Sequence, residues 1–171
     1  TSVDAVLDRL AEHESQLEDA SSPLIAWGLD PIYFPDDRLL AEHLDRVSLT
    51  RPIYVYHASA HLATVNTAML DFSEINEHSI TPGIARNADG TPNGELQEPA
   101  AMMLARSGMT EIAMAIMSNE AKWNYAYEAR NAGHTLLTDL GTTRVNDADS
   151  LDAWREVTDD PAYPARIMVA G

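Results

Sequence analysis

The stretch Arg51-Pro52-Ile53-Tyr54-Val55-Tyr56-His57, followed by Ala58-Ser59-Ala60-His61, contains the clearest strand pattern in the first half of the chain. Its residues 53–57 are β-branched or aromatic, except for the closing histidine, with a proline before them and small residues after them. This combination is typical of a β-strand. After the strand we expect a helix, because apolar residues recur at helical spacing at Leu62, Val65, Ala68, Met69 and Phe72.

Upstream of this strand, the pattern predicts two helices around a second strand. Apolar spacing predicts a helix from Val3 to about Leu17, with Ser2 positioned to cap it. Residues 24–28 are typical of a short buried strand. Asp36-Asp37 are expected to open another helix that continues to about Val47, since acidic residues in a first turn favour the positive end of the helix dipole.

Downstream, clustered turn residues between 82 and 94 predict a small hairpin of residues 83–86 with 94–96. Pro99 suits a helix start, where its missing N–H does no harm. From residue 100 to 132 the sequence favours helix with one interruption at Ser107-Gly108. We expect a short helix before that break and a long one over residues 110–131 after it.

The last third alternates strand, helix and strand over residues 135–141, 150–157 and 165–170. Such a unit implies a parallel pair of strands. The fold class is therefore α/β, with a mixed or parallel sheet and covering helices. The strands carrying Asp139 and Ile167 would leave open sheet edges unless self-association covers them, so we also expect either a homo-oligomer or a rearranged open sheet.

Composition excludes several classes of function. Asp and Glu number 27 against 11 Lys and Arg, which gives a formal charge of −16. A surface this negative repels nucleic-acid backbones and anionic lipids. No apolar run is long enough to span a membrane, and the absence of cysteine removes disulfides, thiolate metal sites and a cysteine nucleophile. We expect a cytoplasmic protein.

Candidate chemistry centres on histidines and carboxylates near strand ends. His57 and His61 are the only close pair among the six histidines, and a third ligand for zinc is not evident, so a polar cluster at a strand end is the simpler interpretation. Asp139 ends an apolar strand and is either a ligand-facing group or a cap for the next helix or loop. Glu98 suits a helix N-terminus by its charge. Nothing matches a phosphate-binding loop or a serine-hydrolase elbow.

Several motifs, taken in order, resemble one family of enzymes. Residues 51–70 resemble a strand ending in histidine and a following helix that carries Val-Asn-small-Ala-Leu. Residues 81–84 precede residues 86–98, which resemble the family's Ile-x-Arg-Asp-x-x-Gly-x-Pro-Thr-Gly-x-Leu-x-Glu hairpin. Residues 27–30 resemble its Gly-Trp-Asp stretch, and residues 133–141 resemble its Gly-Val-Thr-Ser-Val-His-Asp-x-Gly strand. The family is that of the metal-dependent amidohydrolases of the amidohydrolase 3 type. Asn93 and Thr138 depart from its pattern.

The resemblance implies a metal-dependent hydrolase of C–N bonds in non-peptide amides, built on a TIM barrel. It also implies a small-molecule, amide-like substrate. Residues 1–98 would be an inserted α/β lobe and residues 99–171 a partial barrel segment. The family's paired His-x-His ligands do not occur here, so the divalent ions, with zinc expected, would be held by ligands outside the chain. The resemblance thus implies no catalytic residue and no metal ligand among these residues, and a chain that is inactive alone.

By matching position, the resemblance implies that His61, Asn66, Glu98 and Asp139 bind substrate or shape its pocket. The start at Thr1 without Met and the end at Gly171 favour an internal fragment of a longer enzyme. The alternative is a non-catalytic binding or regulatory protein built on the same lobe. His-x-His ligands upstream in the parent reading frame would favour the enzyme.

Overall fold

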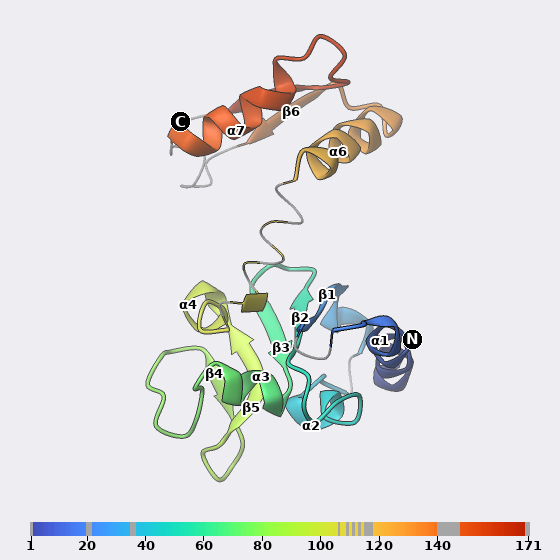
Figure 1. Ribbon diagram of the computed structural model, residues 1–171. Coiled ribbons are helices and arrows are strands. Elements are labelled where there is room, and N and C mark those ends of the chain that lie inside the picture. Colours follow the sequence, from blue (N-terminus) through green and yellow to red (C-terminus); the bar gives the residue numbers. More distant parts are fainter. Residues whose placement is uncertain are drawn as a thin grey trace. The chain divides into compact units, whose positions relative to one another are not determined.

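The computed structural model describes residues 2–19, 22–34, 37–105, 107–108, 110, 112, 114, 118–139 and 148–169. The chain divides into two units, Thr1–Ile112 and Ala113–Gly171 (Figure 1). The predicted boundary at residue 98 falls inside the first unit. The assignment of the two parts to an inserted lobe and a barrel segment stays a prediction.

A five-stranded mixed sheet in the order β1-β2-β3-β5-β4 forms the first unit. β1 and β2 run parallel, and the other neighbours run antiparallel. The predicted strand at residues 53–57 and the predicted hairpin are confirmed. The strands are β1 (Leu24–Leu29), β2 (Ile53–His57), β3 (Leu62–Val65), β4 (Ile84–Arg86) and β5 (Pro92–Gln97).

The helices of this unit are short except for the first. Ser2 caps α1 by accepting a hydrogen bond from the amide of Ala5, as predicted. The predicted second helix is reduced to one turn, because residues 37–40 are irregular and the amide of Leu40 bonds to the ring of His43. The helical segments are α1 (Val3–Gln16), η1 (Pro31–Tyr33), α2 (Ala41–Leu44), α3 (Thr67–Phe72) and α4 (Glu98–Met102).

The helix predicted to begin near Leu62 is wrong over its first part. Residues 62–65 form β3, which pairs antiparallel with both β2 and β5. The turn at residues 58–61 reverses the chain, and β3 gains a full set of partners on either side. Helix α3 starts only after Asn66, whose side chain accepts a hydrogen bond from the amide of Met69.

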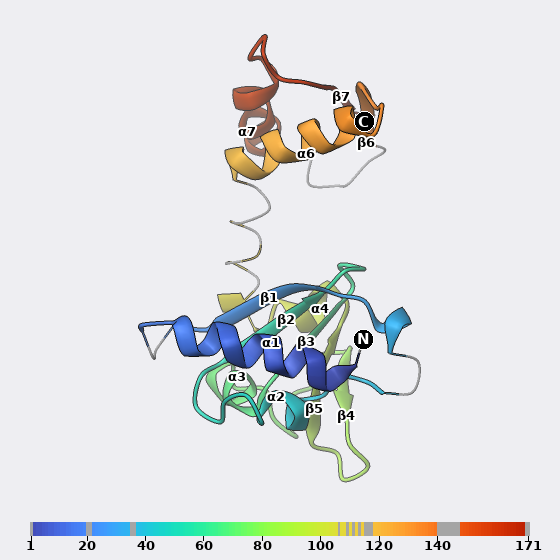
Figure 2. The same cartoon turned by 90° about the vertical axis from the view of Figure 1, so that its right-hand side faces the viewer.

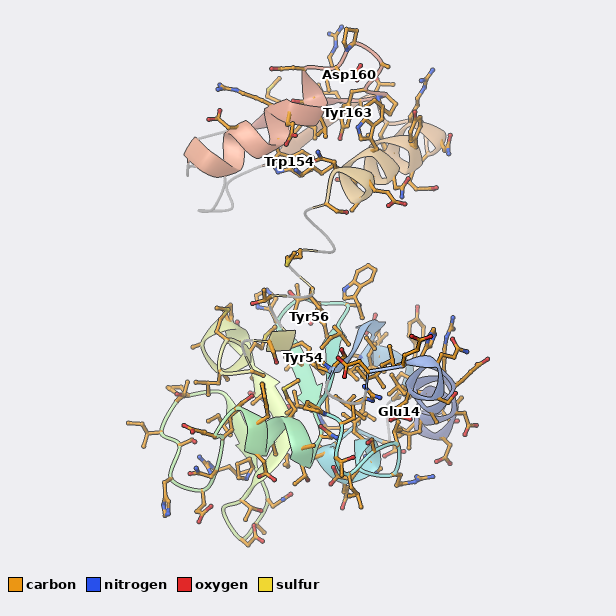
Figure 3. The ribbon with its side chains drawn as sticks, in the orientation of Figure 1. Glu14, Tyr54, Tyr56, Trp154, Asp160 and Tyr163 are labelled. Atoms are coloured by element: carbon orange, nitrogen blue, oxygen red, sulfur yellow. The ribbon has the colours of Figure 1, made fainter. Side chains whose placement is uncertain are left out.

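Alternate residues of β2 face opposite sides of the sheet, and each side has its own core. Ile53 and Val55 pack with apolar residues of α1, β1 and α2, and Figure 2 shows α1 lying across this face. Tyr54 and Tyr56, labelled in Figure 3, belong to the other core, with residues of α3, α4 and the segment after α4. The candidate functional site lies at one end of this two-sided sheet.

The helical region after α4 breaks elsewhere than predicted. The turn falls at residues 103–105, whereas Ser107 and Gly108 are helical. Gly108 is required by packing, because a Cβ there would overlap the ring of Tyr54. Ser118 has an extended backbone and caps α6 (Asn119–Asn131), so the single long helix predicted over residues 110–131 is wrong.

The second unit contains the predicted strand–helix–strand motif. β6 (Leu136–Asp139) and β7 (Arg166–Val169) pair in parallel, connected through α7 (Ala148–Thr158). Trp154 of α7 and Tyr163, which follows α7, pack against α6 (Figure 3). The hydroxyl of Tyr163 donates to the carbonyl of Lys122 at 3.0 Å. The α/β fold class is thereby confirmed.

No helix in the described ranges has the length and apolarity needed to cross a bilayer. Self-association through open strand edges stays a prediction.

Candidate functional site

One end of the five-stranded sheet collects polar residues from segments that are distant in sequence. β2 ends there at His57 and the turn of residues 58–61 follows, while the pairing of Leu62 with Gln97 brings the end of β5 to the same place. β1 ends there too, because it runs parallel to β2. Carboxyl ends of parallel strands are where α/β proteins place their ligands. This end of the sheet is the candidate site.

His61 and Glu98, both expected from the sequence to contact substrate, are in direct contact at this end. Nδ1 of His61 lies 2.8 Å from Oε2 of Glu98, and both side chains are 65 % exposed. The backbone reinforces the pair, since the amide of Glu98 donates to the carbonyl of His61 at 2.8 Å. The strand pairing therefore brings together two of the four predicted site residues.

The backbone around this pair is strained. Ala60 has φ 62° and Glu98 has φ 63°, in the left-handed region that residues with a Cβ avoid. The hydroxyl of Tyr56 donates to the carbonyl of Ala60 at 3.3 Å and holds the turn. Non-glycine residues kept in this region occur preferentially at ligand and active sites. Two such residues flank or form the His61–Glu98 pair, which makes it the candidate for a binding site.

The pair has a defined hydrogen-bonding chemistry. An ionised carboxylate only accepts hydrogen bonds, so Nδ1 of His61 donates to Glu98. In the neutral ring Nε2 is then an acceptor, and the carboxylate fixes the orientation of the imidazole. Such a group can accept a hydrogen bond from a ligand N–H or contribute one ligand to a cation.

The described residues do not assemble a metal centre. None of their histidines, aspartates or glutamates form a group of three or more that could hold a metal ion. Zinc sites in proteins use three or more protein ligands. His61 and Glu98 could supply two at most, and the expectation that this chain carries no metal ligands stays a prediction.

A second polar group, which we call the Glu95 cluster, lies on the face of the sheet that α1 covers. Its members are Arg38, His57, Thr64, Glu95 and Gln97. Nε of Arg38 donates to Glu95 at 3.0 Å, and Nη2 donates to the same oxygen. Nε2 of Gln97 donates to the other carboxylate oxygen at 2.6 Å. Because the Glu95 side chain is only 4 % exposed, these contacts compensate a buried charge.

His57, which ends β2, belongs to this cluster and is 3 % exposed. Its Nε2 lies 2.9 Å from Oγ1 of Thr64 on β3. Burial lowers the pKa of His57 to about 4, against a smaller opposing effect of the Glu95 charge. The ring is therefore neutral at pH 7.

Sequence reasoning did not assign the Glu95 cluster to the site. Thr64 and Glu95 are cross-strand partners, so their side chains share one face. That relation becomes visible only when β3 is recognised as a strand between β2 and β5. Without the partner strands, the alternation of Thr64 with Ala63 and Val65 does not indicate which residues share a face.

Asn66 lies at the opposite end of β3 and is fully buried. Its Oδ1 accepts hydrogen bonds from the amides of Ile53 and Met69 at 2.8 and 3.0 Å. Its Nδ2 donates to the carbonyls of Ser48 and Arg51 at 2.8 and 2.9 Å. The chain's own backbone thus uses both ends of the amide, and the predicted contact of Asn66 with substrate stays a prediction.

Asp139 ends β6 in the second unit, paired with Val169. Its side chain lies outside the described residues, so its predicted part in the pocket stays a prediction.

A groove of about 1180 Å³ lies between α1 and β1. Arg9 and His13 of α1 line it, together with Trp27 and Tyr33, whose side chains are largely exposed. Neither His61 nor Glu98 lines the groove. We place the candidate site at the His61–Glu98 pair because contact geometry and strained backbone coincide there.

The first unit combines a mixed sheet and helices with a polar pair at one strand end, and the fold is of the α/β class. The sequence matches the Amidohydrolase family over residues 1–170, and the chain belongs to that family. The expected family membership is therefore confirmed.

Two relatives show the extent of the likeness. The N-substituted formamide deformylase of Arthrobacter pascens is 32% identical over 108 residues, which are 61% of this chain and 19% of that protein. The crystal structure of an uncharacterized metal-dependent hydrolase from Pyrococcus horikoshii OT3 matches with a TM-score of 0.54 at 15% identity, over 98% of this chain and 30% of that one. The structural match supports the fold alone. The chain spans about a fifth of the curated relative and under a third of the structural one.

Proposed function

We propose that this chain forms the substrate-contacting part of a metal-dependent hydrolase that cleaves C–N bonds of non-peptide amides. The single observation that carries the assignment of the site is the His61–Glu98 pair, with its 2.8 Å contact and left-handed backbone. Family membership supports the reaction class. The name of the Arthrobacter pascens relative supports N-substituted formamides as the first substrates to try.

A divalent ion held by other parts of such an enzyme, with zinc as the first candidate, would activate the attacking water. The residues of this chain would bind and orient the substrate. Glu98 keeps the proton of His61 on Nδ1, so Nε2 accepts a hydrogen bond from the N–H of the amide. That bond fixes the direction of the C–N bond relative to the attacking water, which lowers the barrier by orientation.

The reaction class is tested with the full-length protein that contains this sequence, loaded with zinc. We expect hydrolysis of N-substituted formamides, followed as release of formate and amine. If the loaded protein hydrolyses no member of an amide, formamide, urea and lactam panel, the assignment as an enzyme is overturned. The non-catalytic binding or regulatory alternative is then favoured.

The roles of His61 and Glu98 are tested in the same protein by His61→Gln and Glu98→Gln. We expect kcat/KM to fall at least tenfold in each, since a misaligned ring loses its hydrogen bond to the substrate. The first unit offers a matched control in His78 and Glu77, a second exposed imidazole–carboxylate pair with a longer contact of 3.5 Å. His78→Gln and Glu77→Gln should leave kcat/KM within twofold of the unmodified protein. Equal losses in both pairs would overturn the assignment of the His61–Glu98 pair to substrate binding.

A further inference from the structure

The buried ring of His57 presents an atom whose hydrogen bond is unexplained. Nδ1 of His57 has no hydrogen-bond partner among the described residues. The residue is 3 % exposed, so bulk water does not supply the bond. A buried acceptor without a donor costs about 1–3 kcal/mol. Natural proteins rarely leave such a group unpaired.

The hydrogen bonds of the neighbouring hydroxyl favour one tautomer of the ring. Oγ1 of Thr64 donates its only proton to the carbonyl of Leu39, at 3.3 Å. With its proton on the Leu39 bond, this hydroxyl accepts from Nε2 of His57, which lies 2.9 Å away, and we assign this direction rather than the reverse. Nε2 is protonated, and in the neutral ring Nδ1 is a bare acceptor that needs a donor.

A small cavity lies beside this ring. It is lined by His57, Glu95, Arg38 and Asp37, with apolar side chains completing the wall. The space open to the centre of a water-sized sphere is about 10 Å³. That is about the room of one water molecule.

We propose that this cavity binds one water molecule, which donates one hydrogen bond to Nδ1 of His57 and the other to the carboxylate of Glu95. This water bridge joins β2 to β5 across β3. The turn to His61 begins at the same end of β2, and Glu98 follows the same end of β5. The water bridge therefore belongs to the frame that holds the exposed pair in place.

Other occupants fit less well. An anion would lie beside two acidic residues, Asp37 and Glu95, which line the cavity. A cation would compete with the guanidinium of Arg38, which already binds Glu95. An apolar occupant would leave Nδ1 without a donor.

The tautomer is tested on the 171-residue chain with ¹⁵N-labelled histidine. Long-range ¹H–¹⁵N correlation spectra at pH 7 should show the proton of His57 on Nε2 and none on Nδ1. A proton on Nδ1 would overturn the proposal. A crystal structure at high resolution should show one ordered water within hydrogen-bond distance of Nδ1 and the carboxylate, and an empty cavity would overturn the proposal equally.

Counting long-lived waters gives a third test. Oxygen-17 relaxation dispersion should report one fewer long-lived water in His57→Phe than in the unmodified chain, because the phenyl ring offers no acceptor. His78→Phe makes the same exchange at a residue 87% exposed and should lose none. If the two variants lose the same number, the cavity does not hold the water; if His57→Phe fails to fold, the spectra and the crystal structure of the unmodified chain decide.

Discussion

The two ends of β3 carry polar residues with opposite environments. Before the strand, His61 is largely exposed, touches Glu98 and follows a residue with left-handed backbone. After the strand, Asn66 is fully buried and makes four hydrogen bonds to backbone groups. The side chain of Asn66 forms its hydrogen bonds with the chain's own backbone. The ring of His61 uses only Nδ1 in its contact with Glu98.

The contrast separates two residues of one sequence motif that were both predicted to contact substrate. Residue type and spacing are similar for the two, because His and Asn both suit a strand end. Exposure and remaining hydrogen-bond capacity separate them. Substitutions at the two ends of the sheet test this separation, beginning with the largest effect.

Asn66→Ala should lower the free energy of unfolding of the first unit by about 3–5 kcal/mol. The substitution takes a hydrogen-bond partner from the amide of Ile53 and from the carbonyls of Ser48 and Arg51, each loss costing about 1–3 kcal/mol before relaxation, while the amide of Met69 keeps its bond to the backbone carbonyl of residue 66. Urea unfolding measures this loss of stability, and hydrogen exchange of the Ile53 and Met69 amides reports it locally. His61→Ala, the matched change at the other end, should cost less than about 1 kcal/mol, as exposed ion pairs do; similar losses would abolish the contrast.

Gly94→Ala tests the packing next to Asn66 and should cost about 2–4 kcal/mol. Gly94 has φ 94°, and an added Cβ would overlap the carbonyl of Val65 and the amide of Ala41. Gly90 has nearly the same φ of 91° but nothing within 4 Å of an added Cβ. Gly90→Ala should therefore cost only about 1 kcal/mol, the conformational part. If Gly94→Ala and Gly90→Ala lower the stability equally in thermal or urea unfolding, the backbone around Gly94 can shift to accommodate a Cβ.

The stability of the first unit should rise as the pH increases from about 4 to 6.5. Burial lowers the pKa of His57 from 6.5 to about 4, so the unfolded chain binds more protons in this range. Protonation therefore favours unfolding, and stability is lost as the pH falls through this window. The shift corresponds to at most about 3 kcal/mol. Urea unfolding at several pH values measures the slope of the unfolding free energy against pH, which His57→Phe should reduce. An unchanged slope would mean that carboxylates, and not His57, cause it.

Sequence patterns predicted the elements whose signals are local. The Ser2 cap, the β2 strand, the turn-rich hairpin of β4 with β5 and the β6–α7–β7 motif all rest on neighbouring residues and are confirmed. β3 could not be predicted this way. Its residues have helical spacing with Met69 and Phe72, and the strand forms only because β2 and β5 supply partners on both sides.

The candidate site was predictable to a similar degree. The family resemblance pointed to His61 and Glu98, and the pairing of β3 with β5 explains why residues so distant in sequence meet. The Glu95 cluster was not predictable, because a carboxylate in a short strand is ordinarily exposed. Its burial follows from Arg38, which comes from an irregular segment that the sequence pattern assigned to a helix.

The smallest effect concerns the strain stored at the exposed end. Glu98→Ala removes the pair but keeps a Cβ at φ 63°, whereas Glu98→Gly removes the pair and relieves the backbone. We expect the glycine variant to be more stable than the alanine variant by about 1 kcal/mol. His61 is not in the left-handed region, so there the order should reverse, with His61→Gly less stable than His61→Ala by about 0.5–1 kcal/mol. If glycine is the less stable choice at both positions, Glu98 holds no strain, and its backbone ceases to distinguish the ligand-facing end from the structural one.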